Sequence, residues 1–317
     1  MNNMKKTIYI GTRGSALALY QAERVKAELE AACPDLSVDL KIIKTKGDKI
    51  LDVALSKIGD KGLFTKEIEV ALINGDVDIA VHSLKDLPTT LPEGMQLGAV
   101  LERGDCRDAL VSVKGKKLNN LTAGDVVATS SLRRSSSLLS VNPNVKIVDI
   151  RGNVNTRIEK MESGYCDAMI MAAAGLERLG MEKYITEYLD PEVMIPAVSQ
   201  GAIALEIRHG DSYIQSVINN INHPQTWETV LAERAFLRTL EGGCQVPVGC
   251  YSKVEGNTIT ITGLVSELDG KTNIKDVIVA PLENTEQLGI DLANKLIEKG
   301  AGEILSRIKA NLNNKEE

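Results

Sequence analysis

The stretch TIYIGTRGSALALYQAERVKAELEAAC, residues 7–33, decides the fold of this chain. Its beginning, Thr7–Gly11, has the composition of a short strand, and Ser15–Cys33 has the apolar spacing of an amphipathic helix. The same alternation continues, which predicts a strand at Val38–Lys44, a helix at Phe64–Asn74 and a strand at Asp78–His82. This rhythm is typical of βαβ units on a parallel or mixed sheet with helices on both faces.

The rest of the chain predicts two further regions. The rhythm breaks at Glu102–Arg107 and then restarts, with strands expected at Ala109–Val113, Val126–Ala128, Lys146–Asp149 and Ala168–Met171. After a second crossing at Pro196–Gly201, Ala202–Arg208 is expected to return to the first sheet. From about residue 222 the pattern changes to a helix, three consecutive strands and a helical end, namely Gln225–Leu240, Val248–Lys253, Thr258–Val265, Asp276–Ala280 and Thr285–Leu312.

These patterns predict three domains. The first two are α/β, at 1–101 with 200–219 and at 106–196, and the third, at 222–317, is α+β with an antiparallel sheet. The polar stretch Thr45–Leu63 is long for a connection, and such segments are functional lids or disordered.

Composition excludes several classes of function. Hydrophobic residues make up 43% and charged residues 25% of the 317 residues, which is ordinary for a soluble globular protein. Aromatic residues are scarce at 3% and the net charge is -6, so a nucleic-acid partner is not expected and any anion site must be local. Three dispersed histidines argue against a histidine metal site, and we expect no metal.

The same composition predicts a cytoplasmic location. No apolar run approaches the roughly 20 residues of a membrane span, and the first residues lack the apolar stretch of a secretory signal. Five cysteines without a Cys-x-x-Cys pair fit a reducing compartment.

Cys244 has the most unusual surroundings of these cysteines. It follows Gly242 and Gly243, whose backbones can adopt conformations that other residues avoid. Pro247, three residues later, restricts the backbone of the segment that follows. Such a thiol is a candidate covalent attachment point. The alternative is a turn that holds a small apolar residue.

Basic residues gather in the middle of the chain, with only Asp149 in opposition. They are Arg133, Arg134, Lys146, Arg151 and Arg157. Thr129-Ser130-Ser131 precede the first pair where a strand is expected to end and a helix to start, and Gly152-Asn153 stand at the next such junction. Helix N-termini attract anions, and arginine binds carboxylates or phosphates with two parallel hydrogen bonds. The alternative is arginines paired with acidic neighbours on the surface.

The first domain offers a second set of polar residues. Arg13 and Ser15 lie between the first strand and helix, in a segment that matches neither of the usual nucleotide-binding glycine patterns. The strand ending at His82 leads into Ser83, Lys85 and Asp86. A carboxylate among cations can stabilise a cationic intermediate or shuttle a proton, which makes Asp86 the candidate catalytic group. His82 is expected to be structural.

Six motifs in order make the chain resemble the hydroxymethylbilane synthase (porphobilinogen deaminase) family. They are GTRGS at 11–15, VHSLKDLP at 81–88, TSSLRR at 129–134, DIRGNVNTR at 149–157, AAGLERL at 173–179 and EGGC at 241–244. The resemblance implies two α/β domains with mixed sheets, like those of periplasmic binding proteins, plus a smaller C-terminal α+β domain.

The resemblance also implies a transferase that joins four porphobilinogen molecules head to tail, releases ammonia each time and hydrolyses the product free as hydroxymethylbilane. It implies a dipyrromethane cofactor held through a thioether to Cys244. Because substrate and cofactor carry acetate and propionate groups, a local arginine cluster in an acidic protein has a physical cause. We expect a monomer with porphobilinogen as its partner, and neither nucleic acid nor membrane.

By the same resemblance Asp86 is the catalytic carboxylate, close to the pyrrole N–H groups. The residues implied to bind the cofactor are Cys244, Ser83, Lys85, Asp86, Thr129, Ser130, Ser131, Arg133, Arg134, Arg151, Gly152 and Asn153. Those implied to bind substrate are Arg13, Ser15, Arg157, Arg178 and Gln200. Lys61 and Phe64 are expected to border the lid.

Two other functions remain open on the residues alone. A non-catalytic clamshell protein that binds anions would explain the α/β domains and the arginines, without a special role for Cys244 or Asp86. A thiol enzyme with a Cys-His pair would need a base and an orienting residue, and the sequence identifies neither. Release of ammonia from porphobilinogen separates the main hypothesis from the first alternative.

Overall fold

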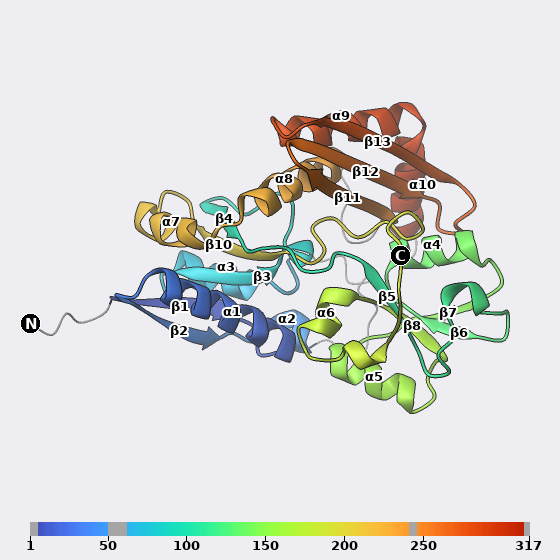
Figure 1. Ribbon diagram of the computed structural model, residues 1–317, viewed down its shortest axis with the longest axis horizontal. Helices are drawn as coiled ribbons and strands as arrows, with labels where there is room; N and C mark the ends of the chain where they lie inside the picture. The colour runs from blue at the N-terminus through green and yellow to red at the C-terminus, as the bar shows by residue number, and fades with distance from the viewer. Residues whose placement is uncertain (1–5, 50–61, 241–245, 314–317) are drawn as a thin grey trace, which may run out of the picture. The chain divides into compact units, whose positions relative to one another are not determined.

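The computed structural model describes residues 6–49, 62–240 and 246–313 (Figure 1). The chain forms two compact units. Unit 1 comprises 1–51, 60–104 and 202–227, and unit 2 comprises 52–59, 105–201 and 228–317. The boundaries at Gly104 and Gly201 fall in the two stretches where the sequence pattern breaks. The division into three domains stays a prediction.

Unit 1 is built on a five-stranded mixed sheet in the order β2-β1-β3-β10-β4. Its strands are β1 (Lys6–Thr12), β2 (Leu36–Ile42), β3 (Ile79–Ser83), β4 (Met95–Val100) and β10 (Ile203–Arg208). β1 runs parallel to β2 and β3, whereas β10 is antiparallel to both β3 and β4. The predicted return of 202–208 to the first sheet is therefore confirmed, and β4 is a strand that the sequence pattern missed.

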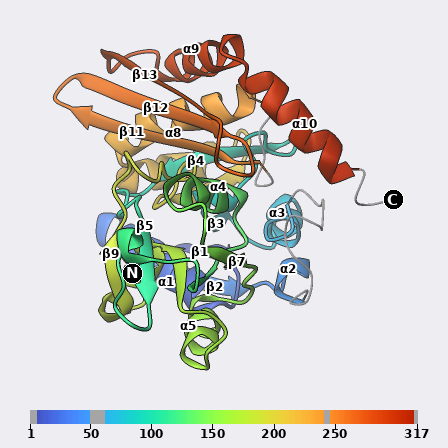
Figure 2. The ribbon, with the colours of Figure 1, turned by 90° about the vertical axis from the view of Figure 1, so that its right-hand side faces the viewer.

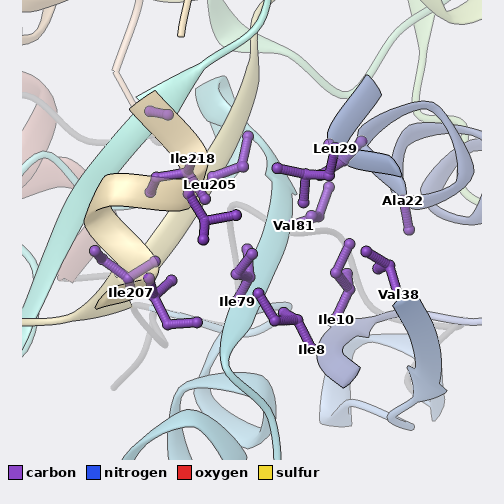
Figure 3. Packing of buried hydrophobic residues seen from close by; sticks show 14 of the residues in the cluster. Ile8, Ile10, Ala22, Leu29, Val38, Ile79, Val81, Leu205, Ile207 and Ile218 are labelled. Atoms are coloured by element: carbon purple, nitrogen blue, oxygen red, sulfur yellow. The ribbon is translucent and has the colours of Figure 1, made fainter. Parts of the chain in front are cut away.

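Helices cover both faces of this sheet. They are α1 (Ala16–Ala32), α2 (Lys46–Lys49), α3 (Lys66–Ile73), α7 (Ser212–Ile218) and the short 3-10 turns η2 (Leu84–Asp86) and η5 (Asn219–Ile221). Figure 3 shows one core, where isoleucine, valine and leucine side chains of β1, β3 and β10 meet α1 and α7. On the opposite face Ile68 and Leu72 of α3 pack against Ala80 and Met95. Burial on both faces explains why β3 begins with the apolar run Ile79-Ala80-Val81.

Unit 2 contains a second mixed sheet in the order β7-β6-β8-β5-β9. Its strands are β5 (Asp108–Ser112), β6 (Val126–Ala128), β7 (Lys146–Val148), β8 (Ala168–Ala172) and β9 (Ile185–Tyr188). As in unit 1, three parallel strands are followed by one antiparallel strand, here β5, which lies between β8 and β9. The helical segments are η3 (Leu118–Asn120), α4 (Leu132–Val141), α5 (Val154–Glu162), α6 (Ala173–Glu177) and η4 (Glu182–Tyr184).

The third sheet is antiparallel and also belongs to unit 2 (Figure 2). It comprises β11 (Val248–Glu255), β12 (Thr258–Ser266) and β13 (Asn273–Pro281), and it packs with α8 (Pro224–Thr239), α9 (Thr285–Glu298) and α10 (Ala301–Asn313). Two mixed sheets and one antiparallel sheet are the predicted fold class. Among the described residues no helix is long and apolar enough to cross a membrane.

Glycines allow the closest packing in unit 2. A Cβ atom on Gly289 of α9 would lie 2.0 Å from the carbonyl oxygen of Ala232 in α8. A Cβ atom on Gly270, in the turn between β12 and β13, would lie 2.3 Å from the carbonyl oxygen of Ser136 in α4. The third sheet therefore braces α4, the helix that carries the predicted arginine pair.

Candidate active site

In unit 1 the predicted polar residues gather where the parallel strands end, which we call the carboxyl edge of the sheet. Arg13 directly follows β1, and Ser15 caps α1 by accepting a hydrogen bond from the amide of Ala18 at 3.3 Å. Ser83 ends β3, the neighbour of β1. Parallel neighbours end at the same edge, so the fold brings these segments together, at the place where α/β sheets bind ligands.

Asp86 lies on η2, directly after β3, and its side chain is exposed. The amide of Leu84 donates to the carbonyl oxygen of Ala202 at 3.0 Å, which fixes the start of this turn to unit 1's own sheet. Within the described part of the chain, Asp86 has no side-chain hydrogen bond or ion pair. Lys85 beside it is half-buried. The carboxylate is therefore accessible to a substrate.

Arg13 is held by groups that the sequence did not suggest. Its Nε and Nη2 donate to Asp48 Oδ1 at 3.1 Å and 2.5 Å, and its guanidinium lies 4.2 Å from the centre of the Phe64 ring. Asp48 also accepts from the Thr45 hydroxyl at 2.8 Å. Burial alone would raise the pKa of Asp48, but the hydrogen bonds from Arg13 and Thr45 lower it below its ordinary value.

His82 forms a buried pair beneath this edge. Its Nε2 lies 3.0 Å from Oε2 of Glu206 on β10, and both side chains are almost fully buried. Glu69 of α3 is close by, and its pKa is raised by burial and by the charge of Glu206. The structural role expected for His82 fits this placement on the α3 face of the sheet.

In unit 2 the predicted residues also follow parallel strands. Thr129, Ser130 and Ser131 follow β6, while Arg151, Gly152 and Asn153 follow β7. The Ser130 hydroxyl donates to the carbonyl oxygen of Ile150 at 2.9 Å and accepts from its amide at 3.0 Å. These two hydrogen bonds connect the loop after β6 with the loop after β7.

Both loops lead into capped helices. Ser131 accepts from the amide of Arg134 at 3.4 Å, and Asn153 accepts from the amide of Thr156 at 3.0 Å. Gly152 has φ 115°, a region that favours glycine, and its carbonyl accepts from Arg157 Nε at 2.8 Å. Burial lowers the pKa of Arg151. Capped N-termini and guanidiniums are groups that attract anions, and the anion site itself stays a prediction.

Arg133 and Arg134 are buried rather than on the surface. Arg133 Nη1 donates to Asp108 Oδ2 at 2.6 Å and to the carbonyl oxygen of Ile195 at 2.7 Å. Arg134 donates to Asp108 Oδ1 from Nε at 3.0 Å and from Nη2 at 2.7 Å, and Nη1 donates to the carbonyl oxygen of Ile170 at 3.1 Å. Their assignment to the cofactor remains a prediction, and part of each guanidinium is committed to Asp108.

Of the remaining predicted residues, the structure describes Arg178 and Gln200. Arg178 follows α6 and donates to the carbonyl oxygen of Gly201 at 2.5 Å, and Gln200 is buried beside Asp108, with its Nε2 3.0 Å from Oδ1. Cys244 and Lys61 lie outside the described residues.

Comparison with known proteins identifies the family. A family model described as "Porphobilinogen deaminase, dipyromethane cofactor binding domain" matches residues 8–216, and one described as "Porphobilinogen deaminase, C-terminal domain" matches 227–298. The chain belongs to the porphobilinogen deaminase family. The porphobilinogen deaminase of Geotalea uraniireducens is 50% identical over 303 residues, which cover 96% of this chain and 95% of that protein. That of Synechococcus sp. (strain RCC307) is 51% identical over 307 residues, with 96% and 97% covered.

Solved structures give a weaker likeness. The effector-binding domain of BenM with benzoate has a TM-score of 0.43 and 17% identity, over 72% of this chain and 95% of that one. A TRAP periplasmic solute binding protein from Desulfovibrio salexigens has a TM-score of 0.42 and 14% identity, over 71% and 75%. Similarity at this level does not bear on what a porphobilinogen deaminase does.

Three polar residues of the site were not found from the sequence. Gln21 donates from Nε2 to the Ser83 hydroxyl at 2.8 Å, and Asp48 and Asp108 pair with the predicted arginines. Gln21 had a usable signal, because it is a polar residue on the buried face of the helix α1. The two aspartates had none, since each lies 25 or more positions from its arginine.

Proposed function

We propose that this chain is a hydroxymethylbilane synthase that joins four porphobilinogen molecules head to tail on a dipyrromethane primer attached to Cys244. Each addition releases ammonia, and water finally frees the linear hydroxymethylbilane. The observation that carries the proposal is family membership over nearly the whole chain. The placement of the family's motifs at the carboxyl edges of two mixed sheets supports it.

The residues at the carboxyl edge of unit 2 fit a ligand that carries several carboxylates. Hydroxyls, helix N-termini and guanidiniums are the donors that carboxylates prefer. We assign the cofactor's acetate and propionate groups to Thr129, Ser130, Ser131, Arg133, Arg134, Arg151, Gly152 and Asn153. When bound, the dipyrromethane supplies the pyrrole carbon to which the first porphobilinogen is joined.

The carboxyl edge of unit 1 fits the chemical step. Loss of ammonia from porphobilinogen leaves a cation, and the exposed carboxylate of Asp86 lowers its free energy and accepts a proton after coupling. Ser83 and Lys85 are assigned to the pyrrole carboxylates beside it. Gln21 restricts the rotamer of Ser83 through its hydrogen bond, so this hydroxyl is oriented before substrate arrives.

Substrate carboxylates are assigned to half-buried groups in both units. Arg13 and Ser15 belong to unit 1, whereas Arg157 and Arg178 belong to unit 2. Arg13 is held by Asp48 and Phe64, so its guanidinium is oriented without being fully buried. An arginine in that state binds a carboxylate with little loss of side-chain entropy.

We also propose that the protein acts as a monomer in the cytoplasm. Support for a reducing compartment comes from Cys33, Cys106, Cys166 and Cys250, which form no disulfides in the described part of the chain. Burial, chiefly, raises the pKa of the Cys166 thiol to about 11, which keeps it protonated and unreactive.

Intact-mass measurement together with an ammonia assay tests the proposal. Protein incubated with porphobilinogen should be heavier than its sequence by one dipyrromethane and should release ammonia with every addition. The Cys244→Ala variant should stay at the mass of the bare chain, and a Cys250→Ala variant, which changes a buried thiol, should become loaded. Freshly active protein with the bare mass would refute the covalent cofactor. Binding of porphobilinogen without release of ammonia would favour the clamshell binding protein, which family membership disfavours.

A further inference from the structure

Asp108 is a buried carboxylate to which the proposed function gives no role. It is the first residue of β5, its side chain is 0% exposed, and its carbonyl oxygen accepts from the amide of Leu189 at 2.8 Å. Because β5 is antiparallel to β8, Asp108 pairs with Ala172 at the carboxyl edge of the parallel strands. Sheet hydrogen bonding on both sides therefore fixes the backbone of Asp108 beside the predicted anion site.

The two oxygens of Asp108 are divided between two arginines of α4. Oδ2 accepts from Arg133 at 2.6 Å, and Oδ1 accepts twice from Arg134, at 3.0 Å and 2.7 Å. Carbonyl oxygens of Ile195 and Ile170 hold a further N–H group of each guanidinium. Each arginine is thus held at two points, which removes most of its rotamer freedom.

Gln200 completes this arrangement from a separate segment. Its Nε2 donates to Asp108 Oδ1 at 3.0 Å and to the carbonyl oxygen of Cys106 at 2.8 Å. The residue before it, Ser199, has φ 60°, an unusual conformation for a residue with a side chain. The amide of Ser199 donates to Glu233 Oε2 at 2.7 Å, and this bond with a buried carboxylate supports the strained backbone. Gln200 is therefore also held in one place.

Electrostatics favour the ionised form of Asp108. Burial alone would raise its pKa, but the charges of Arg133 and Arg134, together with their hydrogen bonds, hold the pKa of this carboxyl well below its usual range. Both arginines belong to the first turn of α4, so their charges act on Asp108 from one helix end. The lowered pKa keeps the carboxylate charged at neutral pH, so the two guanidiniums keep their shared partner.

We propose that Asp108 is a positioning residue, which holds the guanidiniums of Arg133 and Arg134 in the orientation that receives a carboxylate of the dipyrromethane. This inference rests on the proposed function. Buried cations without such a partner would repel each other and turn toward other acceptors, and each would have to be reordered when the ligand binds. Asp108 touches neither substrate nor cofactor, and it acts through the two arginines.

The test compares Asp108→Asn with Asp125→Asn, both produced in a host that cannot make porphobilinogen. Asp125 is a matched control because it is a buried carboxylate of unit 2 that pairs with Lys116 at 2.7 Å and, in the described part of the chain, has no hydrogen bond with a predicted ligand-binding residue. The first readout is the reactivity of each arginine toward phenylglyoxal, measured by peptide mass spectrometry on the cofactor-free protein. We expect Asp108→Asn to raise the reactivity of Arg133 and Arg134 about 5-fold or more relative to Arg307, which is exposed. Asp125→Asn should leave it unchanged.

The second readout is the rate at which intact protein gains the mass of dipyrromethane when porphobilinogen is added. In the folded fraction, isolated by size exclusion, Asp108→Asn should be loaded about 10-fold more slowly, whereas activity per loaded molecule should stay within about 3-fold of wild type. Unchanged arginine reactivity, or loading as fast as that of Asp125→Asn, overturns the inference. Failure of the wild-type protein to gain mass would instead contradict the proposed function.

A second variant tests the proposed positioning role if Asp108→Asn does not fold. Gln200→Met removes one donor to Asp108 and leaves its charge and both ion pairs in place. We expect the reactivity of Arg134 to rise about 2-fold or more, since Gln200 Oε1 also lies 3.4 Å from Arg134 Nη2. No rise in Arg134 reactivity in this variant would also overturn the inference.

Discussion

At the carboxyl edge of the sheet in unit 1 the key carboxylate, Asp86, is exposed and has no ion-pair partner among the described residues. At the same edge of the sheet in unit 2 the key carboxylate, Asp108, is completely buried beneath two guanidiniums. The sheets share one strand pattern, so topology does not cause the difference. A carboxylate in water is available to a reacting cation, whereas a carboxylate that is paired and dry orients cations for binding. We infer that unit 1 supplies the chemical step and that unit 2 supplies most of the groups that bind the cofactor's carboxylates.

Asp86→Asn is the strongest challenge to this comparison. The variant should still hold the cofactor, and its turnover of porphobilinogen should fall about 10³-fold, because an amide neither stabilises a cation nor accepts a proton. Loading is followed by intact mass and turnover by ammonia release.

Asp39→Asn is the control for that experiment. Asp39 is exposed on β2 of the same sheet, and it has no predicted role. Its variant should keep wild-type turnover. Wild-type turnover in Asp86→Asn would remove Asp86 from the mechanism and with it the division of labour between the units.

Arg133→Met and Arg13→Met compare the arginines of the two units. Loss of Arg133 leaves part of a buried carboxylate unpaired and should lower the free energy of unfolding by about 3 kcal/mol. Loss of Arg13 breaks a half-exposed pair with Asp48 and should lower it by less than about 1 kcal/mol. Urea titrations give both values. Equal losses would show that the two arginines are held alike.

The sequence predicted the elements of the fold better than the partners of its charges. The strand β6 and the start of β12 lie where they were expected, because buried strands between turn residues carry a clear local signal. β4 and β9 were missed, since their identity depends on pairing with β10 and β5 rather than on their own pattern.

For the site residues as well, the local sequence pattern predicted helix caps but did not predict ion-pair partners that are distant in the sequence. Ser131 and Asn153 are helix caps, as their position before a helix suggested. Asp149 was expected to oppose the basic cluster, but the carboxylate that Arg133 and Arg134 contact is Asp108. Only the pairing of β5 with β8 places Asp108 there, and local patterns in one sequence do not contain that information.

Gly270→Ala tests the brace on α4, the helix that holds Arg133 and Arg134. At φ 71° an alanine is strained, and its Cβ would meet the backbone of Ser136, so the turn must move away from the helix. We expect thermal or urea unfolding to show a loss of about 2 kcal/mol.

Gly256→Ala provides the matched control for the turn. Gly256 joins β11 to β12 with φ 60°, and a Cβ there meets nothing within 4 Å. Its loss should be about 1 kcal/mol, from backbone strain alone. Equal losses in both variants would show that the third sheet does not brace the arginine helix.

Glu69→Gln makes the smallest predicted change and separates the buried carboxylates of the two units by sign. Burial, and then the charge of Glu206, raise the pKa of Glu69, although Thr65, His82 and Lys66 act in the opposite direction. A carboxyl whose pKa is higher in the folded state stabilises the fold below its unfolded pKa, and that contribution is lost as the pH rises through the folded pKa.

The Glu69→Gln side chain does not ionise, so the variant keeps this contribution at high pH. It should be more stable than wild type at pH 8 by about 1 kcal/mol, with the difference vanishing near pH 4. Asp108, whose pKa is lowered, has the opposite dependence: its contribution is present above its unfolded pKa and is lost only as the pH falls through the folded pKa. Urea titrations of Glu69→Gln and wild type across this pH range measure the effect. A gain at pH 4 as large as that at pH 8 would mean that the ionisation of Glu69 does not cause the gain. The cause would then be the buried Glu69 Oε1, which has no hydrogen-bond partner among the described residues.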